Sequence, residues 1–354
     1  MLNNLNAKIR YSAALVGCSR MGAFIDNESS DPSLSPYSHA AGYMKCERTD
    51  LVACSDIRPN VMRIAGQKYN IPETNQYTDY KKMILEIQPD IVSVATQPEQ
   101  RAEVVIFAAN NKAKAIYAEK AMSASIEEAY EMSAACIKNN VAFNLGTNRR
   151  YDSGFNSMAN LIKEESLGKL KALVAYCTGS LFNMGSHNFD LLLKLNNESK
   201  VTSVTANLTE FIWDSELKEL KNDPTGQGVI AFENGVKAYA FNVSNETKWD
   251  AICENGVVSA IDNGGHFIVR AKNKKYQLDF EKTSSTLNLI YDLVASIDNS
   301  KPYLGGIEIS VMSTEIIFGF IQSHLTHSKV RFPFTPLGIK LNRDFKPRTP
   351  KYNR

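Results

Sequence analysis

The stretch KIRYSAALVGCSRMG, residues 8–22, decides the fold. Residues 8–16 are expected to form a strand, and residues 13–16 are apolar enough to be buried on both faces. The strand runs directly into GCSRMG, which matches the pattern G-x-G-x-x-G except that Ser19 stands at the second glycine. Gly17 permits a tight turn, Gly22 lets the next helix pack on the sheet, and backbone N–H groups face a pyrophosphate. The pattern favours a dinucleotide site; a glycine turn without a ligand is the alternative.

A second strand, residues 51–55, ends at Asp56. A carboxylate at this position holds both hydroxyls of a ribose, usually about 20 residues beyond the glycines. The gap is longer here, and the polar, turn-rich segment 26–36 is typical of an insertion, so the first helix is expected to resume near residue 39. Asp56 lies close to Pro59, so a role in capping the next helix stays open.

Strands and helices alternate from there to residue 145, with strands expected at 90–95, 115–118 and 141–145. Such alternation is typical of an α/β fold with a doubly wound parallel sheet, a Rossmann domain, whose ligands bind at the carboxyl ends of the strands. Several candidate residues follow strands at that edge: Gly17, Asp56, Thr96 and the pair Glu119-Lys120.

From residue 201 the pattern changes to short strands and turns, including Asn-Gly turns at 234–235 and 255–256, which predicts an antiparallel sheet. Helices are expected at 286–298 and 308–327. We therefore expect a domain over residues 1–147, a second domain over 148–335 and a basic tail over 336–354. The tail is expected to be a solvated arm or to pack on a partner subunit.

The composition of the chain argues against several classes of function. The chain has 354 residues with 40 Lys+Arg against 38 Asp+Glu, a net charge of +2, which gives no global reason to bind nucleic acid or an anionic membrane. Apolar runs such as 316–321 are too short to cross a bilayer. The 6 cysteines form no Cys-x-x-Cys pair, so a cytoplasmic protein is expected. His324 and His327 lack a third ligand, so no metal is expected.

Several motifs occur in a fixed order, and together they resemble the Gfo/Idh/MocA family, the relatives of glucose–fructose oxidoreductase and inositol dehydrogenase. The resemblance spans residues 8–333 and implies a Rossmann domain followed by an α/β domain with a large, mainly antiparallel open sheet. It also implies NAD or NADP and a sugar, cyclitol or sugar-nucleotide substrate. The motifs are the glycine loop with Arg20, Asp56, Thr96-Gln97-Pro98, Ala102-Glu103, Glu119-Lys120, Asn148-Arg149-Arg150-Tyr151 and Gly185-Ser186-His187 with Asp190.

The resemblance implies roles for individual residues. Lys120 corresponds to the family's active-site lysine, although Ala121 stands where proline is usual. His187 corresponds to the histidine of a D-x-x-x-H motif whose aspartate is here Asn183, an amide that can orient the imidazole but not stabilise its charged form. The implied cofactor contacts are Gly17, Ser19, Arg20, Met21, Gly22, Asp56, Thr96, Gln97, Glu119 and Lys120. The implied substrate contacts are Lys120, Arg149, Arg150, Asn183 and His187.

These features predict an oxidoreductase that transfers hydride between a nicotinamide and a secondary alcohol or keto group. NAD is expected over NADP because Asp56 would repel a 2′-phosphate, a preference that Arg20 and Arg58 weaken. A glycosidase that oxidises its substrate transiently and a non-catalytic dinucleotide sensor remain alternatives. Lys120 as a solvated lysine, His187 as a core histidine, and Arg149 and Arg150 as a bridge between domains also stay open. A strand at 236–243 that is apolar on both faces predicts a homodimer or homotetramer.

Overall fold

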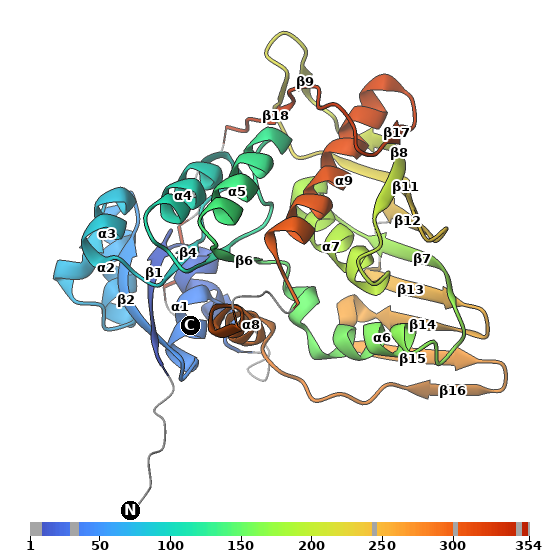
Figure 1. Cartoon of the computed structure of the whole chain (residues 1–354), viewed down its shortest axis with the longest axis horizontal. Coiled ribbons are helices and arrows are strands. Elements are labelled where there is room, and N and C mark those ends of the chain that lie inside the picture. Colours follow the sequence, from blue (N-terminus) through green and yellow to red (C-terminus); the bar gives the residue numbers. More distant parts are fainter. Residues whose placement is uncertain (1–8, 29–34, 243–245, 300–303, 345–348, 353–354) are drawn as a thin grey trace, which may run out of the picture.

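The computed structural model describes residues 9–28, 35–242, 246–299, 304–344 and 349–352. It contains two large sheets side by side, each with its own helices (Figure 1), and a small third sheet. The first sheet is parallel throughout, in the order β3-β2-β1-β4-β5-β6. The strand order reverses between β1 and β4, so a crevice forms at the carboxyl ends of these strands. The strands are β1 (Tyr11–Val16), β2 (Thr49–Ser55), β3 (Gln76–Tyr77), β4 (Ile91–Val94), β5 (Ala115–Ala118) and β6 (Ala142–Leu145).

Helices connect these strands, and their ends follow capping residues. At the start of the last of these helices, Ser125 Oγ accepts from the Glu128 N–H at 3.1 Å, and Glu128 Oε2 accepts from the Ala124 N–H at 3.0 Å. The helices are α1 (His39–Lys45), α2 (Pro59–Lys68), α3 (Tyr80–Ile87), α4 (Pro98–Asn110) and α5 (Ile126–Lys138).

The predicted interruption of the first helix is confirmed. The glycine loop leads into the short turns η1 (Arg20–Phe24) and η2 (Ile25–Glu28), and α1 begins at His39. Asp26 closes the inserted segment because its carboxylate accepts from the Tyr37 N–H at 2.7 Å and the Ser38 N–H at 2.9 Å. Residues 29–34 of the expected insertion lie outside the described residues.

The second sheet has 9 strands in the order β16-β15-β14-β13-β7-β12-β11-β8-β17, antiparallel except for the β7–β12 pair. Helices α6 (Ser153–Lys163), α7 (Ser186–Leu195) and α9 (Ile307–Thr326) lie on the face toward the first domain (Figure 1). The strands are β7 (Leu170–Cys177), β8 (Val201–Thr209), β11 (Thr225–Phe232), β12 (Lys237–Asn242), β13 (Lys248–Cys253), β14 (Gly256–Ile261), β15 (His266–Ala271), β16 (Lys274–Gln277) and β17 (Val330–Arg331). Within the described part of the chain, no helix is both long and apolar enough to cross a membrane.

One helix returns from the second domain to the first. Helix α8 (Ser285–Asn299) packs against α1, so closely that a Cβ on Gly42 would lie 2.6 Å from Ile290 Cδ1. Leu289, Ile290 and Leu293 join the hydrophobic cluster that also contains Tyr43 and Tyr117. The expected boundary near residue 147 follows β6, the last strand of the first sheet, but the first domain also includes this later helix.

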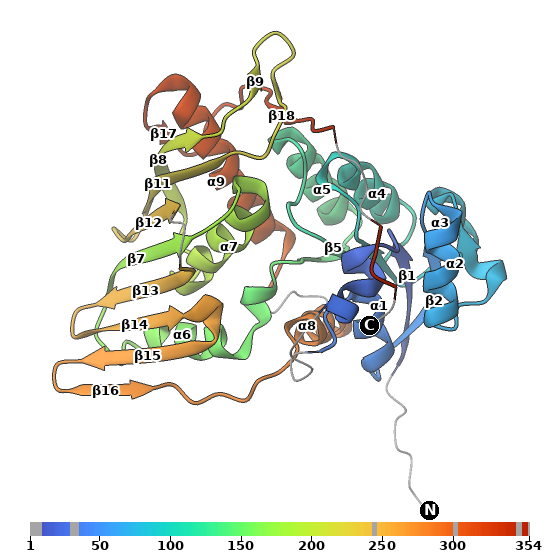
Figure 2. The same cartoon turned by 180° about the vertical axis from the view of Figure 1, so that it is seen from behind.

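The described part of the tail packs on its own chain and is not a solvated arm, and a contact of these residues with a partner subunit stays a prediction. Strand β18 (Lys340–Leu341) pairs with β10 (Glu219–Leu220), which also pairs with β9 (Trp213–Asp214). Arg343 forms an ion pair with Glu99 at 2.8 Å, and the Tyr352 ring meets the Phe24 ring edge-on. Figure 2 shows the last described segment ending beside the first domain. Lys346, Arg348 and Arg354 lie outside the described residues.

Candidate functional site

The glycine loop joins the carboxyl ends of the first sheet. Gly17 has φ of +93°, and a Cβ there would lie 2.8 Å from the Ala95 backbone oxygen. A Cβ on Gly22 would lie 1.9 Å from the Gly17 backbone oxygen. Both positions therefore exclude a side chain, as the sequence pattern predicted. Ser19 precedes η1, but its hydroxyl makes no capping hydrogen bond.

Asp56 holds the glycine loop against β2. Its Oδ2 accepts from the Cys18 N–H at 2.9 Å, and its Oδ1 accepts from the Arg58 N–H at 2.9 Å. The Arg58 guanidinium also reaches this carboxylate, at 3.1 Å. Arg58 therefore covers the group predicted to bind the ribose. Arg20 instead pairs with Glu28 at 2.8 Å, and its guanidinium lies 4.0 Å from Met21 Sδ.

Thr96 and Gln97 form the opposite side of the crevice, after β4. Thr96 Oγ1 is buried and has no hydrogen-bond partner, while its backbone oxygen accepts from Arg101. Gln97 Oε1 lies 3.5 Å from the guanidinium of Arg343, which the tail supplies. An unsatisfied buried hydroxyl calls for a ligand, and beside a loop that excludes side chains it fits a dinucleotide.

Glu119 does not face the crevice. Its Oε1 lies 3.1 Å from His39 Nε2, and only 4% of the residue is exposed. Burial raises the pKa of Glu119, but His39, Lys120 and Arg101 together outweigh this, and the net pKa is lowered. The His39 ring also stacks on Tyr117 and contacts Ser93 Oγ. The Glu119 carboxylate is therefore held by His39 beneath the Lys120 loop, and the expected role of Glu119 in cofactor binding stays a prediction.

Lys120 reaches across to the second domain, where its ammonium donates to Asn183 Oδ1. Asn183 lies in the helical turn η6 (Leu181–Gly185), and His187 follows one turn later in α7. His187 Nδ1 is buried and has no hydrogen-bond partner among the described residues, while Asn183 Oδ1 is occupied by Lys120. The amide instead orients Lys120.

The surroundings of Lys120 and His187 disfavour a positive charge on either side chain. Burial lowers the pKa of Lys120, helped by Arg101 and Arg149 and opposed by Glu119 and Asp223. Burial also lowers the pKa of His187 well below its ordinary value, and the charges of Arg149 and Lys120 add to this. His187 is therefore neutral at pH 7, and Lys120 gives up its proton more readily than a solvated lysine.

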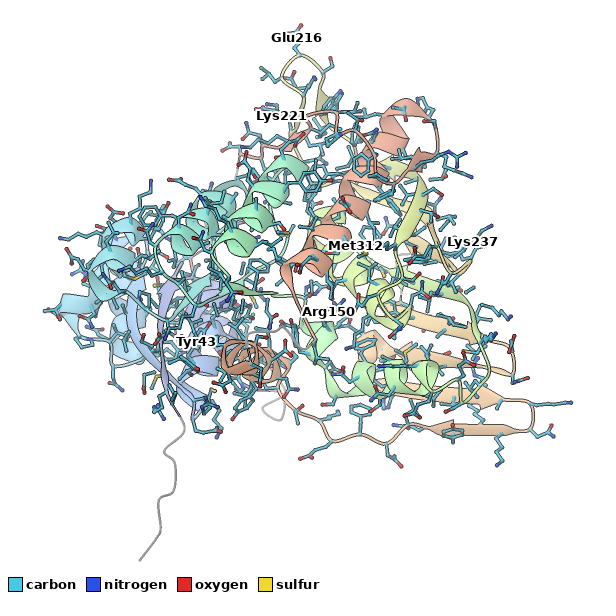
Figure 3. All side chains as sticks on the ribbon, viewed as in Figure 1. Tyr43, Arg150, Glu216, Lys221, Lys237 and Met312 are labelled. Atoms are coloured by element: carbon cyan, nitrogen blue, oxygen red, sulfur yellow. The ribbon has the colours of Figure 1, made fainter. Side chains whose placement is uncertain are left out.

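The neighbouring arginines differ in their roles. Arg150 is 2% exposed and donates to Asp190 at 2.9 Å, Glu198 at 2.6 Å and the Leu304 backbone oxygen at 2.8 Å. It lies where the two domains meet (Figure 3), and all three guanidinium nitrogens are used within the chain. These contacts agree with the bridging alternative, and the expected binding of substrate by Arg150 stays a prediction.

Arg149 remains at the site. Its guanidinium lies over the Trp249 ring, 4.9 Å from the centroid, and Nη2 donates to Asn263 Oδ1 at 2.6 Å. Its Nε is buried without a partner, and burial lowers the pKa of Arg149 to about 10. Sequence reasoning missed Trp249, Asn263 and Asp223, which lie in distant turns and strands and carry no local motif.

A family model described as "Oxidoreductase family, NAD-binding Rossmann fold" (GFO_IDH_MocA) matches residues 29–147. The chain is 25% identical over 218 residues to the uncharacterized oxidoreductase YrbE of Bacillus subtilis, covering 58% of this chain. It is 24% identical over 211 residues to the myo-inositol 2-dehydrogenase of Thermotoga maritima, covering 56% of this chain. In both cases the match spans 62% of the relative's length.

Solved structures share the fold over most of the chain. An aldose-aldose oxidoreductase of Caulobacter crescentus, complexed with glycerol, has a TM-score of 0.76 at 16% identity, covering 91% of this chain and 100% of that one. An inositol dehydrogenase homologue of Azotobacter vinelandii, complexed with NADH and myo-inositol, has a TM-score of 0.74 at 14% identity, covering 92% and 98%. At these identities the likeness shows the two-domain fold.

Proposed function

The chain belongs to the Gfo/Idh/MocA oxidoreductases, and from this premise we propose that it transfers hydride between a nicotinamide and a secondary alcohol or keto group of a polyhydroxylated compound. One observation carries the proposal: Lys120, at the carboxyl end of β5, extends to Asn183 across the junction of the domains, one helical turn from His187. This places a partly buried amine and an imidazole together beside the dinucleotide crevice.

Bound NAD supplies or accepts the hydride. The chain must bind and orient the substrate and the cofactor, and it must move one proton. As an ammonium, Lys120 hydrogen-bonds the reacting oxygen and stabilises alkoxide character. As an amine, it accepts the hydroxyl proton, which its lowered pKa makes easier. The neutral His187 passes this proton onward or shares it.

The wall next to Lys120 suits a substrate with many hydroxyls. Buried polar atoms without partners need hydrogen bonds that a ligand can supply. Arg149, fixed over Trp249, offers Nε from the same wall. We assign the substrate to the sugars, cyclitols or sugar-nucleotide-like compounds, a class that includes the inositol named for two relatives. The unpartnered atoms are Asn148 Oδ1, Arg149 Nε, His187 Nδ1 and Asn188 Oδ1.

The test begins with cofactor binding. NADH and NADPH are titrated against the purified protein by nicotinamide fluorescence, and we expect binding of both with preference for NADH. Oxidation of a panel containing myo-inositol, free aldoses and sugar nucleotides is then followed by nicotinamide absorbance, and we expect at least one to react. Failure to bind either dinucleotide would refute the proposal.

A non-catalytic sensor is the second candidate, because Asn183 removes the carboxylate that would stabilise an imidazolium. It predicts tight NADH binding without turnover of any member of the panel. A glycosidase with transient oxidation predicts instead that a glycosidic bond is cleaved while the bound cofactor is not consumed.

We also propose that the chain forms a homodimer or homotetramer through the face of the second sheet opposite α6, α7 and α9. Phe241 on β12 is 39% exposed and Ile252 on β13 is 37% exposed, so this face carries apolar surface. A monomer by light scattering at micromolar concentration would contradict this. The 6 cysteines are free and buried, which supports a reducing compartment, and we propose the cytoplasm.

A further inference from the structure

Positive charge gathers at the candidate catalytic centre. Lys120 and Arg149 both act on His187, and Arg101 donates to the Ala121 backbone oxygen just behind Lys120. The adjacent carboxylate, Glu119, is bonded to His39. Position 183, where the family has a carboxylate, is an amide. Glu119 favours the Lys120 ammonium but is also bound to His39, so a second carboxylate near Lys120 bears on the charge of this centre.

Asp223 lies on the far side of Asn183, in the loop between β10 and β11. Its Oδ1 accepts from the Phe182 N–H at 2.8 Å, and its Oδ2 accepts from the Asn183 N–H at 3.1 Å. Ser180, the residue before η6, makes no capping bond and instead donates its hydroxyl to Asp223 at 2.7 Å. The carboxylate therefore caps this turn from a different segment of the chain.

The loop that carries Asp223 is itself anchored. The Pro224 backbone oxygen accepts from the Leu181 N–H at 2.7 Å, so the loop holds η6 at a second point. On its other side, the Asn342 N–H of the tail donates to the Leu220 oxygen at 2.9 Å. The β9–β10 hairpin and the tail strand β18 lie together above α5 and beside the upper end of α9 in Figure 1. The loop that carries Asp223 is therefore held in place by hydrogen bonds on both sides.

We propose that Asp223 supplies a second carboxylate to this centre beside Glu119, as a positioning residue that fixes Asn183 against Lys120 and opposes the positive charge of Lys120. Asn183 is held at its backbone by Asp223 and at its side chain by Lys120, which makes it the link between the two charges. The assignment rests on the proposed function for its meaning in catalysis, but its electrostatic effect exists without substrate.

Charges around both groups agree with this arrangement. Burial raises the pKa of Asp223, against the hydrogen bonds from Ser180, Phe182 and Asn183 and the charge of Arg343. Around Lys120, Glu119 and Asp223 favour the ammonium, while burial, Arg101 and Arg149 oppose it. Removing the charge of Asp223 must therefore lower the pKa of Lys120 further.

The decisive measurement is the pKa of Lys120 in the unliganded protein. Trace acetic anhydride at a series of pH values, followed by peptide mass spectrometry, reports the reactivity of this amine alone. We expect Asp223→Asn to lower the pKa of Lys120 by about one unit. Asp214→Asn is the matched control. Asp214 lies in β9, nine residues before Asp223, and its carboxylate likewise accepts from two N–H groups, those of Glu216 and Leu217, at 3.1 and 3.0 Å. It should cause no shift.

A second variant moves the charge instead of removing it. Asn183→Asp combined with Asp223→Asn should return the pKa of Lys120 to or above its wild-type value. If Asp223→Asn does not fold, Asp223→Ser keeps a hydrogen-bond acceptor without the charge and should give the same downward shift. Thermal melting and NADH titration verify that each variant is intact.

An unchanged pKa of Lys120 in a folded, charge-neutral variant at 223 would overturn the inference, whatever the protein's substrate. Loss of dinucleotide binding in the wild-type chain would instead refute the proposed function. Once a substrate is known, the pH profile of single-turnover hydride transfer should move with the pKa of Lys120. A merely structural role for Asp223 would lower the rate without moving that profile.

Discussion

The glycine loop and the turn η6 both border the candidate site, but they are held in different ways. The glycine loop is held by the Asp56 carboxylate at the Cys18 N–H, and it is also fixed by steric fit, since an added Cβ at Gly17 or Gly22 would meet backbone oxygen. Turn η6 is fixed by a carboxylate from a remote loop, since Asp223 accepts two of its N–H groups. Substitutions that add atoms should therefore disturb the cofactor side of the site, and substitutions that change charge should disturb the substrate side.

Lys120 joins the two sides, so its loss should have the largest effect. We expect Lys120→Ala to reduce single-turnover hydride transfer by about 10²–10⁴-fold, the range for a general acid–base group, while NADH still binds. Nicotinamide absorbance measures the rate. Near-normal transfer in this variant would remove the amine from the mechanism and favour the sensor.

The same residue sets a pH dependence. Alcohol oxidation needs the neutral amine, so its rate should rise with pH through the pKa of Lys120. Because burial lowers this pKa, the rise should lie below the range of a solvated lysine. A profile that stays flat to the ordinary lysine range would contradict this role.

Gly17→Ala tests the steric side. The left-handed conformation costs an L-residue about 1–2 kcal/mol, and the contact with the Ala95 oxygen adds to it, so NADH should bind at least about tenfold more weakly. Gly235→Ala is the matched control, because its φ is +84° but no atom lies within 4 Å of the added Cβ. It should lower the melting temperature slightly and leave NADH binding intact.

His187→Ala should cost less than Lys120→Ala, about tenfold, at the low end for a group that helps a proton transfer. The imidazole is neutral and its Nδ1 has no partner, so it lacks the support that Asn183 gives to Lys120. Single-turnover rates of the two variants at one pH make the comparison. A larger loss for His187→Ala would reverse their roles.

Arg58→Ala should give the smallest effect. Its guanidinium lies on the carboxylate of Asp56, so its removal frees an acceptor for the ribose hydroxyls and removes a cation that attracts a 2′-phosphate. The ratio of NADPH to NADH dissociation constants should rise a few-fold. A fall in this ratio would show that Arg58 supports NADH.

Local patterns in the sequence predicted the first domain well. Gly17, Gly22 and Asp56 lie together as expected because turn geometry and strand ends are encoded by neighbouring residues. The sequence did not predict that Glu119 turns inward, since its partner His39 lies 80 residues earlier. Such pairing depends on tertiary packing alone.

The second domain was predicted in outline only. The Asn-Gly turns identified the hairpins. The sequence did not show which of the two arginines faces the site, because this depends on the ion pairs of Arg150 with Asp190 in α7 and with Glu198 in the turn after α7. Asp223 carries no motif, and only the fold of its loop against η6 gives it a role. Charge partners that meet through loops leave no periodic signal in a sequence.

The return of α8 to the first domain has a consequence for synthesis on the ribosome. Tyr43 and Tyr117 lie in a cluster that Leu289, Ile290 and Leu293 complete, more than a hundred residues later. Until those residues emerge, the nascent domain exposes apolar surface that chaperones recognise. A recombinant fragment that ends at residue 147 would keep that surface exposed, so a portable cofactor-binding module from this chain requires the 285–299 segment to be grafted back.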